Sequence, residues 1–477
     1  MADFESVIGL ECHVELSTRT KMFCGCRNAF GAEPNTNVCP VCLGLPGSLP
    51  VPNRAAIEYI MRIGLALGCR VADHSLFHRK NYFYPDMPKN FQISQYDVPI
   101  CVAGHLTIEV DGAERDIGIT RVHMEEDTGK TTHAGSTGRI GRAEYALVDY
   151  NRAGVPLVEV VSEPDIHTPD EARAYLTELR AILETLGVSD VRMEEGSLRC
   201  DANISTRRVG DTSLGTKVEV KNLNSIRSLE RALRFEEERQ RTALERGEPL
   251  VQETRHFDEE RGTTHTLRSK EEAFDYRYFP EPDIPRLEPD RAWVEQIRAS
   301  LPVLPAERRR RLVAAHGLPA EQARLIAATP VLATAFDRVR DASGADTRTV
   351  ANWVVNHPGG PEEAGREWRA IADVVRLVDA GEISALAGKD VLESAIASGR
   401  PAEEIVQEKG LRQVSDTSQL EAWVDEALAE NADQVAQYRA GKEGLLGFFV
   451  GQVMKRSGGS ANPNVVNELL RARLGAP

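Results

Sequence analysis

The sequence predicts an α+β domain built on a large antiparallel sheet, followed by an all-α helical domain and a small all-α tail domain. The first 290 residues are rich in Gly, Val, Ile and Thr with frequent turn signals, which is typical of strands. From residue 306 onward the chain is rich in Ala, Leu, Glu and Arg with helical periodicity. We therefore expect domains at 1–290, 291–404 and 405–477.

Strands and helices are interleaved in the first domain. Apolar and polar residues alternate at 7–16 and 106–110, and 157–161 is a short β-branched apolar run around one Glu. Helical spacing predicts helices at 54–68, 169–186 and 225–246, the last capped by Asn224-Ser225.

Prolines and glycines mark the ends of the domains. Between Phe279 and Pro305 the prolines Pro280, Pro282, Pro285, Pro289, Pro302 and Pro305 exclude long regular elements. A second break falls at 399–401, and the tail ends in a helical module at 441–474.

Composition excludes several classes of protein. The formal net charge of −15 argues against a protein that coats nucleic acid nonspecifically, although it allows a local basic face. No stretch approaches the ~18 apolar residues of a membrane helix, and the first residues lack a signal-peptide pattern. We therefore expect a cytoplasmic protein without a membrane partner.

Four of the eight cysteines are clustered in a metal-type pattern. Cys24 and Cys26 form one pair, Cys39 and Cys42 form the other, and a turn-rich segment separates them. Two thiolate pairs brought together by a turn can form a tetrahedral zinc site with no open position, which predicts structural Zn²⁺. Free or redox-active thiols are the alternative.

Acidic residues recur where strands are expected. Glu11, His13 and Glu15 alternate, so they project from one face of a strand, and Glu159 stands in an apolar strand where an unpaired carboxylate is costly. Segment 121–130 adds Glu125 and Glu126, although an acidic surface loop is the alternative for this segment. Scattered carboxylates of this kind suit Mg²⁺ that also holds substrate phosphates.

Familiar catalytic motifs are missing. Gly129-Lys130-Thr131 resembles the end of a P-loop, but Met124 occupies the position of the required first Gly. Arg199, Lys217 and Lys221 are candidate phosphate partners. Because no nucleophile motif is visible, a reaction that needs hydrolysis of a nitrogen donor would require another protein chain.

Longer motifs follow one another along the chain. They are V-I-G-L-E-C-H-V-E-L at 7–16, K-N-Y-F-Y-P-D at 80–86, H-M-E-E-D-T-G-K at 123–130, L-V-E-V-V-S-E-P-D at 157–165, E-G-S-L-R-C-D-A-N at 195–203, V-K-N-L-N-S at 220–225, Q-E-T-R at 252–255, D-Y-R-Y-F-P-E-P-D at 275–283, G-F-F-V-G-Q-V-M-K at 447–455 and N-P-N-V-V-N at 462–467. In this order they resemble the B subunit of the tRNA-dependent amidotransferases, with a cradle domain first and a YqeY-like tail.

The resemblance implies a heterotrimer whose other two members are an amidase and a small third subunit. The amidase would release ammonia, which travels through a channel to the B subunit. The B subunit would bind Glu-tRNA(Gln) or Asp-tRNA(Asn), use ATP to convert the side-chain carboxylate into an acyl phosphate, and form Gln-tRNA(Gln) or Asn-tRNA(Asn). Such an enzyme would be a glutamine-hydrolysing ligase of protein biosynthesis, and the resemblance makes the non-discriminating aminoacyl-tRNA synthetase a further candidate partner.

The resemblance also assigns residues. Glu11, His13, Glu125, Glu126 and Glu159 correspond to the Mg²⁺-associated residues of the kinase-transamidase centre, with Asp201 close by. In the tail, the cations expected to contact tRNA phosphates are Lys455, Arg456, Arg471 and Arg473.

Two other functions stay open. A non-catalytic tRNA-docking scaffold of the same complex would need these carboxylates only for structure. A stand-alone zinc hydrolase is disfavoured because four cysteine ligands leave no position for substrate. The sequence does not decide between Glu-tRNA(Gln) and Asp-tRNA(Asn).

Overall fold

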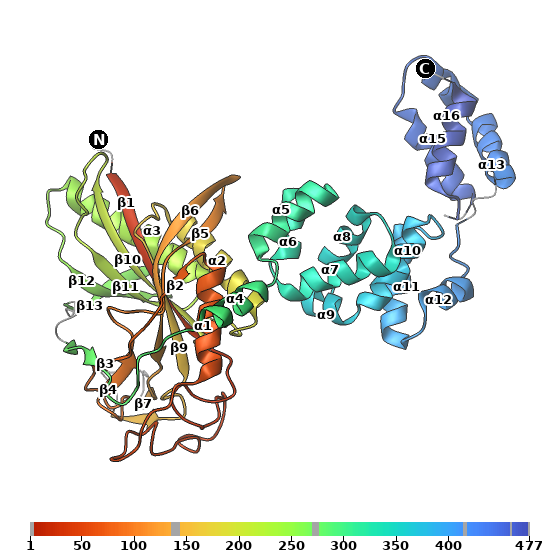
Figure 1. Cartoon of the computed structure of the whole chain (residues 1–477). Coiled ribbons are helices and arrows are strands. Elements are labelled where there is room, and N and C mark those ends of the chain that lie inside the picture. Colours follow the sequence, from red (N-terminus) through yellow and green to blue (C-terminus); the bar gives the residue numbers. More distant parts are fainter. Residues whose placement is uncertain (1–3, 135–143, 270–275, 414–416, 458–459, 476–477) are drawn as a thin grey trace. The chain divides into compact units, whose positions relative to one another are not determined.

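The structure is a computed structural model that describes residues 4–134, 144–269, 276–413, 417–457 and 460–475. Asp275, the first residue of the 275–283 motif, lies outside these ranges. The chain divides into two compact units, Met1–Ala306 and Glu307–Pro477. The predicted fold class is confirmed, with a sheet-based first unit and an all-helical second unit (Figure 1). The three-domain division at 290 and 404 stays a prediction.

A 12-stranded sheet organises the first unit, with its main path in the order β13-β12-β11-β10-β1-β9-β6-β4-β3-β14. β5 pairs with β6 and β2, and every pairing is antiparallel except β11 with β12. The strands are β1 (Phe4–Glu15), β2 (Arg70–Val71), β3 (His78–Asn81), β4 (Phe91–Ser94), β5 (Cys101–Val110), β6 (Ala113–Glu126), β9 (Pro156–Ser162), β10 (Leu198–Arg208), β11 (Val218–Leu223), β12 (Glu253–Asp258), β13 (Thr263–Ser269) and β14 (Phe279–Pro280). A separate hairpin pairs β7 (Lys130–Ala134) with β8 (Tyr145–Asp149).

Helices cover one face of this sheet. The core contains Ile8, Leu10, Cys12 and Val14 of β1 together with residues of α1 (Arg54–Ala66), α2 (Pro169–Leu186) and α3 (Ile226–Glu245). Side chains alternate across a strand, so Glu11, His13 and Glu15 project from the opposite face. That polar face carries the candidate site.

Side-chain caps begin the three covering helices. Asn53 caps α1, Ser225 caps α3, and Thr168 forms a capping box with Glu171 at the start of α2. α4 (Arg291–Ala299) packs against α1 and belongs to the first unit.

The helices of the second unit form two separate hydrophobic clusters. The first cluster joins α5 (Pro305–His316), α6 (Ala320–Ala327), α7 (Pro330–Ser343), α8 (Thr347–Val355), α9 (Gly360–Arg366), α10 (Trp368–Asp379), α11 (Ala385–Ser398) and α12 (Ala402–Lys409). The second joins α13 (Thr417–Glu430), α14 (Ala432–Arg439), α15 (Leu445–Arg456) and α16 (Pro463–Leu474). Among the described residues, no helix has the length and apolar character needed to span a membrane.

Candidate functional site

Strand register places three polar side chains in one row across the middle of the sheet. On β1, His13 lies opposite Glu159 of β9, and Glu159 in turn lies opposite His123 of β6. Because strands β6, β9 and β1 are neighbours, these side chains share the face that the helices leave open. Glu125 lies two residues beyond His123 and projects from the same face.

His13, Glu125 and Glu159 form a group that can hold a metal ion. One ligand atom from each lies within 4.8 Å of the others, and both carboxylates are buried. His13 Nε2 lies 3.7 Å from Glu159 Oε2, and His123 Nε2 lies 3.1 Å from the same oxygen. Two carboxylates and an imidazole form a donor set that fits a divalent cation.

Neighbouring groups hold Glu125 and Glu159 in their charged forms. Burial opposes ionisation, but the positive charges of Lys80 and His123 outweigh it and keep the pKa of Glu125 well below its usual range. Similarly, His123 and His13 lower the pKa of Glu159 to about 2 despite its burial. Ser94 Oγ donates to Glu125 Oε1 at 2.8 Å, which also fixes the orientation of this carboxylate.

His123 is a further member of the site, beyond the residues that the resemblance assigns. Burial disfavours the imidazolium, but the adjacent carboxylates raise the pKa of His123 to about 9. Arg121 Nε donates to His123 Nδ1 at 3.3 Å, which favours the neutral ring. In either state Nε2 carries a proton towards Glu159, so His123 stabilises that carboxylate.

Lys80 is the second unassigned member, and it comes from an edge of the sheet. Its charge interacts with Glu125 and Glu159, and its Nζ lies 5.0 Å from the ring centroid of Tyr276. Burial opposes the ammonium, yet these carboxylates raise its pKa above the usual range. The sequence offers only the motif beginning at Lys80 as a signal, because β3 is far from β1 along the chain.

Other predicted residues lie beside this group, with Arg199 of β10 opposite His13 and Asp201 of β10 opposite Glu11. Glu11 accepts a hydrogen bond from Asn203 Nδ2 at 2.9 Å, and burial followed by the charge of Glu159 raises its pKa. Lys221 Nζ pairs with Asp201 at 2.6 Å. Arg199 also holds a carboxylate, with its Nη2 2.7 Å from Asp127 Oδ2. The predicted phosphate partners Arg199 and Lys221 are therefore already paired.

Glu126 and Lys217 are not brought into the metal-type group. Glu126 is next to Glu125 on β6 and so projects from the other face, where it pairs with Lys89 and accepts a hydrogen bond from Ile93 N at 2.9 Å. This geometry does not support a shared metal site for the two adjacent glutamates. Lys217 is exposed just before β11.

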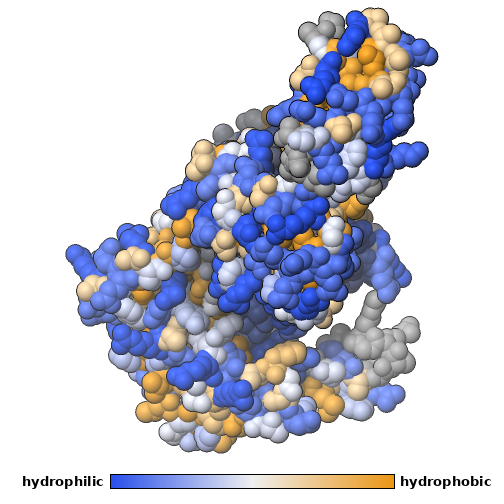
Figure 2. Space-filling model, turned by 90° about the vertical axis from the view of Figure 1, so that its right-hand side faces the viewer, coloured by the Kyte–Doolittle hydropathy of each residue, from blue (hydrophilic) through white to orange (hydrophobic). Residues whose placement is uncertain are grey.

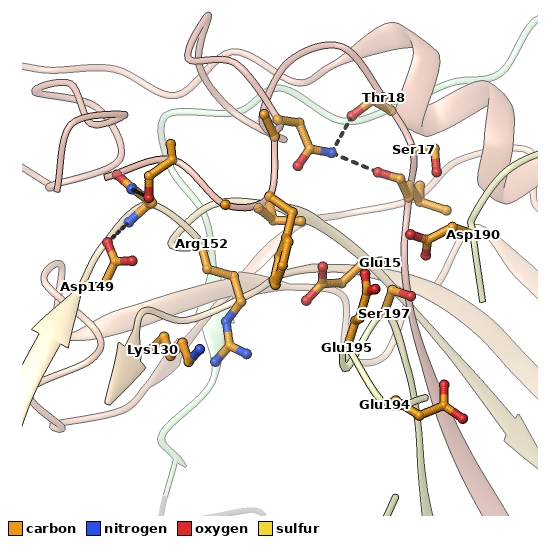
Figure 3. Close-up of a pocket in the computed structure, with 18 residues that line it drawn as sticks. Glu15, Ser17, Thr18, Lys130, Asp149, Arg152, Asp190, Glu194, Glu195 and Ser197 are labelled. Carbon is orange, nitrogen blue, oxygen red and sulfur yellow. Dashed lines mark hydrogen bonds between the residues drawn. The ribbon is translucent and has the colours of Figure 1, made fainter. Parts of the chain in front are cut away.

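A cavity of about 590 Å³ adjoins this region at the end of β1. In Figure 3, Lys130 and Arg152 approach it from one side, whereas Glu15, Asp190, Glu194 and Glu195 approach it from the other. Burial, and then the charge and hydrogen bond of Asp127, raise the pKa of Glu15 to about 8. Arg199 and Arg152 keep the Asp127 pKa low despite burial, so the two carboxyl groups share one proton.

The four clustered cysteines come together in the loop between β1 and α1. The four Sγ atoms all lie within 4.8 Å of one another. A hydrogen bond from Cys24 is the main cause that lowers the pKa of Cys42 to about 5, and the nearby Lys21 ammonium contributes. Four thiol groups at this spacing fit a tetrahedral metal site.

The tail cations fall into two groups. Arg456 is paired with Glu426 and Glu430, and Arg473 Nε lies 2.9 Å from Asp425 Oδ1. Lys455 and Arg471 are exposed. Figure 2 shows an apolar patch bordered by hydrophilic residues on the surface of the tail, so its surface is not uniformly charged.

Fold and site together define a protein of two compact units, of which the first presents side chains that can hold a metal ion on its sheet and the second is helical. Family models match both parts. Residues 6–295 match the GatB/GatE catalytic domain, and residues 335–474 match the GatB domain.

Full-length relatives identify the family. The chain is 54% identical to the B subunit of the aspartyl/glutamyl-tRNA(Asn/Gln) amidotransferase of Moorella thermoacetica, covering 99% of this chain and 100% of that one. It is 51% identical to the B subunit of the same enzyme in Carboxydothermus hydrogenoformans, covering 99% of each chain. The chain belongs to the family of aspartyl/glutamyl-tRNA(Asn/Gln) amidotransferase B subunits.

Proposed function

We propose that the chain activates the side-chain carboxylate of Glu-tRNA(Gln) or Asp-tRNA(Asn) with ATP, and that ammonia then forms the amide. The observation that carries this proposal is the group of His13, Glu125 and Glu159, which lies inside the region matched by the catalytic domain model. Phosphorylation of a carboxylate requires charge neutralisation and alignment more than covalent help from protein.

Mg²⁺ is the cation we assign to this group. Held by His13, Glu125 and Glu159, it would neutralise charge on the transferring phosphoryl group. The protein would position the groups around the cation. Ser94 and His123 hold the two carboxylates in place, and Lys80 adds a fixed positive charge beside them.

Further groups bind the substrates in this proposal. Arg199 and Lys221 neutralise Asp127 and Asp201, and their remaining N–H donors can face phosphate oxygens. Glu11 adds a carboxyl group next to the metal group, and Lys217 is a further phosphate partner. In the tail, we assign the exposed cations Lys455 and Arg471 to tRNA phosphates, whereas Arg456 and the exposed Arg473 are already paired with acidic residues.

The relatives are named as one subunit of their enzyme, which supports a multi-subunit complex. We infer that an amidase partner supplies ammonia and that a small third subunit is needed for the heterotrimer. This division accounts for the lack of a nucleophile motif in the sequence. The four cysteines hold structural Zn²⁺ in this proposal, and the aminoacyl-tRNA synthetase is a further partner.

Substitution of Glu125 tests the proposal in the reconstituted complex. Glu125→Ala should abolish ATP- and Mg²⁺-dependent formation of Gln-tRNA or Asn-tRNA while glutamine hydrolysis by the amidase persists. The exposed strand residue Glu109 provides a matched control, because Glu109→Ala removes a carboxylate far from the group. Full amidation by Glu125→Ala would instead favour the non-catalytic scaffold.

A further inference from the structure

Five tyrosines lie on the segments that border strands β3, β4 and β14, and they form two stacks. Tyr82 and Tyr84 are stacked with ring centroids 4.5 Å apart, and Tyr96 and Tyr278 are stacked at 4.3 Å. Tyr276 meets Tyr278 edge to face at 6.1 Å. We call these five rings the aromatic shelf.

The aromatic shelf presents flat ring surface to solvent. Tyr84 is 46% exposed and Tyr96 is 47% exposed, although both rings are stacked on a neighbour. Phe83 between Tyr82 and Tyr84 is also exposed. A group of exposed aromatic side chains marks a binding surface, because a chain that folds without a partner or ligand normally buries such side chains.

The shelf is held rigidly before any ligand arrives. Arg79 makes two hydrogen bonds to the buried carboxylate of Glu281, from Nε at 2.7 Å and from Nη2 at 2.9 Å. Asn81 Nδ2 donates to the backbone carbonyls of Tyr276 and Arg277 at 2.9 and 2.8 Å. These bonds fix the segment that carries Tyr276 and Tyr278 against β3, so a planar ligand would not have to order it.

Lys80 connects the shelf to the metal-type group. Its Nζ lies 5.0 Å from the Tyr276 ring, and its charge interacts with Glu125 and Glu159. The order across this edge of the sheet is therefore carboxylates, then an ammonium, then aromatic rings. A nucleotide has the matching order, with anionic phosphate at one end and a flat base at the other.

We propose that the aromatic shelf stacks an adenine ring of a reactant whose reacting group lies at the His13, Glu125 and Glu159 group. This inference rests on the proposed function, in which both reactants contain adenosine. ATP is an adenosine nucleotide, and tRNA ends in an adenosine at its 3′ end. Stacking on an aromatic ring is the interaction by which proteins hold a base without reading its sequence. The exposed Tyr96 and Tyr84 supply the outer surfaces.

Steady-state kinetics of the reconstituted complex with the Tyr96→Ala and Tyr84→Ala variants test this assignment. At least one of them should raise the KM for ATP or for the aminoacyl-tRNA by about five- to a hundredfold, with kcat changed less than about twofold. A rise for ATP identifies its base as the ligand, and a rise for aminoacyl-tRNA identifies the terminal adenosine. Tyr96→Phe and Tyr84→Phe should restore the wild-type KM, because they keep the ring.

Controls separate the shelf from other roles. Tyr145 is an exposed tyrosine on β8, and Tyr145→Ala should leave both KM values unchanged. Unchanged KM values in both shelf variants would overturn the proposal, as would weaker co-purification with the other members of the complex at unchanged KM. Failure of the proposed function itself would be seen separately, as full amidation by Glu125→Ala.

Discussion

Glu159 and His13 lie directly opposite each other on neighbouring antiparallel strands, with Oε2 and Nε2 3.7 Å apart. Glu159 is buried within the apolar run 157–161 of β9, and an unpaired carboxylate there would be costly. His13 and His123 flank it on either side, which accounts for its low pKa. The row is therefore a prearranged set of charges.

Neutralising Glu159 should remove activity without unfolding the protein. We expect Glu159→Gln to lower ATP-dependent amidation by about 100-fold or more, because the donor set loses one charged oxygen. The Mg²⁺ concentration needed for half-maximal activity should rise as well. Glu109→Gln is the control, and an unchanged Mg²⁺ dependence in Glu159→Gln would contradict the metal assignment.

Stability should decrease with rising pH because of Glu15. In the folded protein its pKa is raised to about 8, whereas in the unfolded chain it has the ordinary value near 4.5. Between these values the folded state binds one more proton, so the free energy of unfolding falls as pH rises, by at most about 1.4 kcal/mol per pH unit. Glu15→Gln should flatten this dependence between pH 5 and 8. Thermal unfolding measured across that range checks it, and identical slopes for both proteins would refute the shared proton.

Metal removal should destabilise the cysteine loop. Cys39→Ser should reduce bound zinc, measured by elemental analysis, and should lower the Tm of the purified chain, because four thiolates close the site. A chelator should lower the Tm of the wild type in the same way. Cys69→Ala removes a cysteine outside the cluster and should leave the zinc content unchanged. Equal zinc content in Cys39→Ser would disprove the assignment.

In the tail, accessible cations should contribute more to tRNA binding than paired ones. Lys455→Gln and Arg471→Gln should each weaken tRNA binding and reduce the slope of log K against log salt by about 0.9. Arg456→Gln should have a smaller effect, since Glu426 and Glu430 already engage that side chain. Binding isotherms at several salt concentrations test this ranking, with Lys389→Gln on α11 as the control. A larger loss for Arg456→Gln would reverse the interpretation.

Local pattern predicted much of the first unit. The alternation at 7–16 predicted β1 and the common face of Glu11, His13 and Glu15. Helical spacing placed α2, and spacing together with the Ser225 cap placed α3. Period-two alternation works here because one face of the strand is buried against helices and the other is not.

The remaining site residues required knowledge of the sheet. Glu125 and Glu126 form a pair in the sequence, but β6 runs through both, so their side chains project from opposite faces. Lys80 and the tyrosines reach the site only because β3, β4 and β14 are neighbours in the sheet. No local periodicity records such long-range pairing.

The bond between Arg79 and Glu281 joins residues 202 positions apart in the sequence. During synthesis on the ribosome, the β3 edge must therefore wait for most of the first unit to emerge before β14 can close against it. Contacts of such long separation are made late and slow folding, because a large loop must be ordered first. The nascent chain consequently acquires its aromatic surface as one of the last steps in the maturation of this unit.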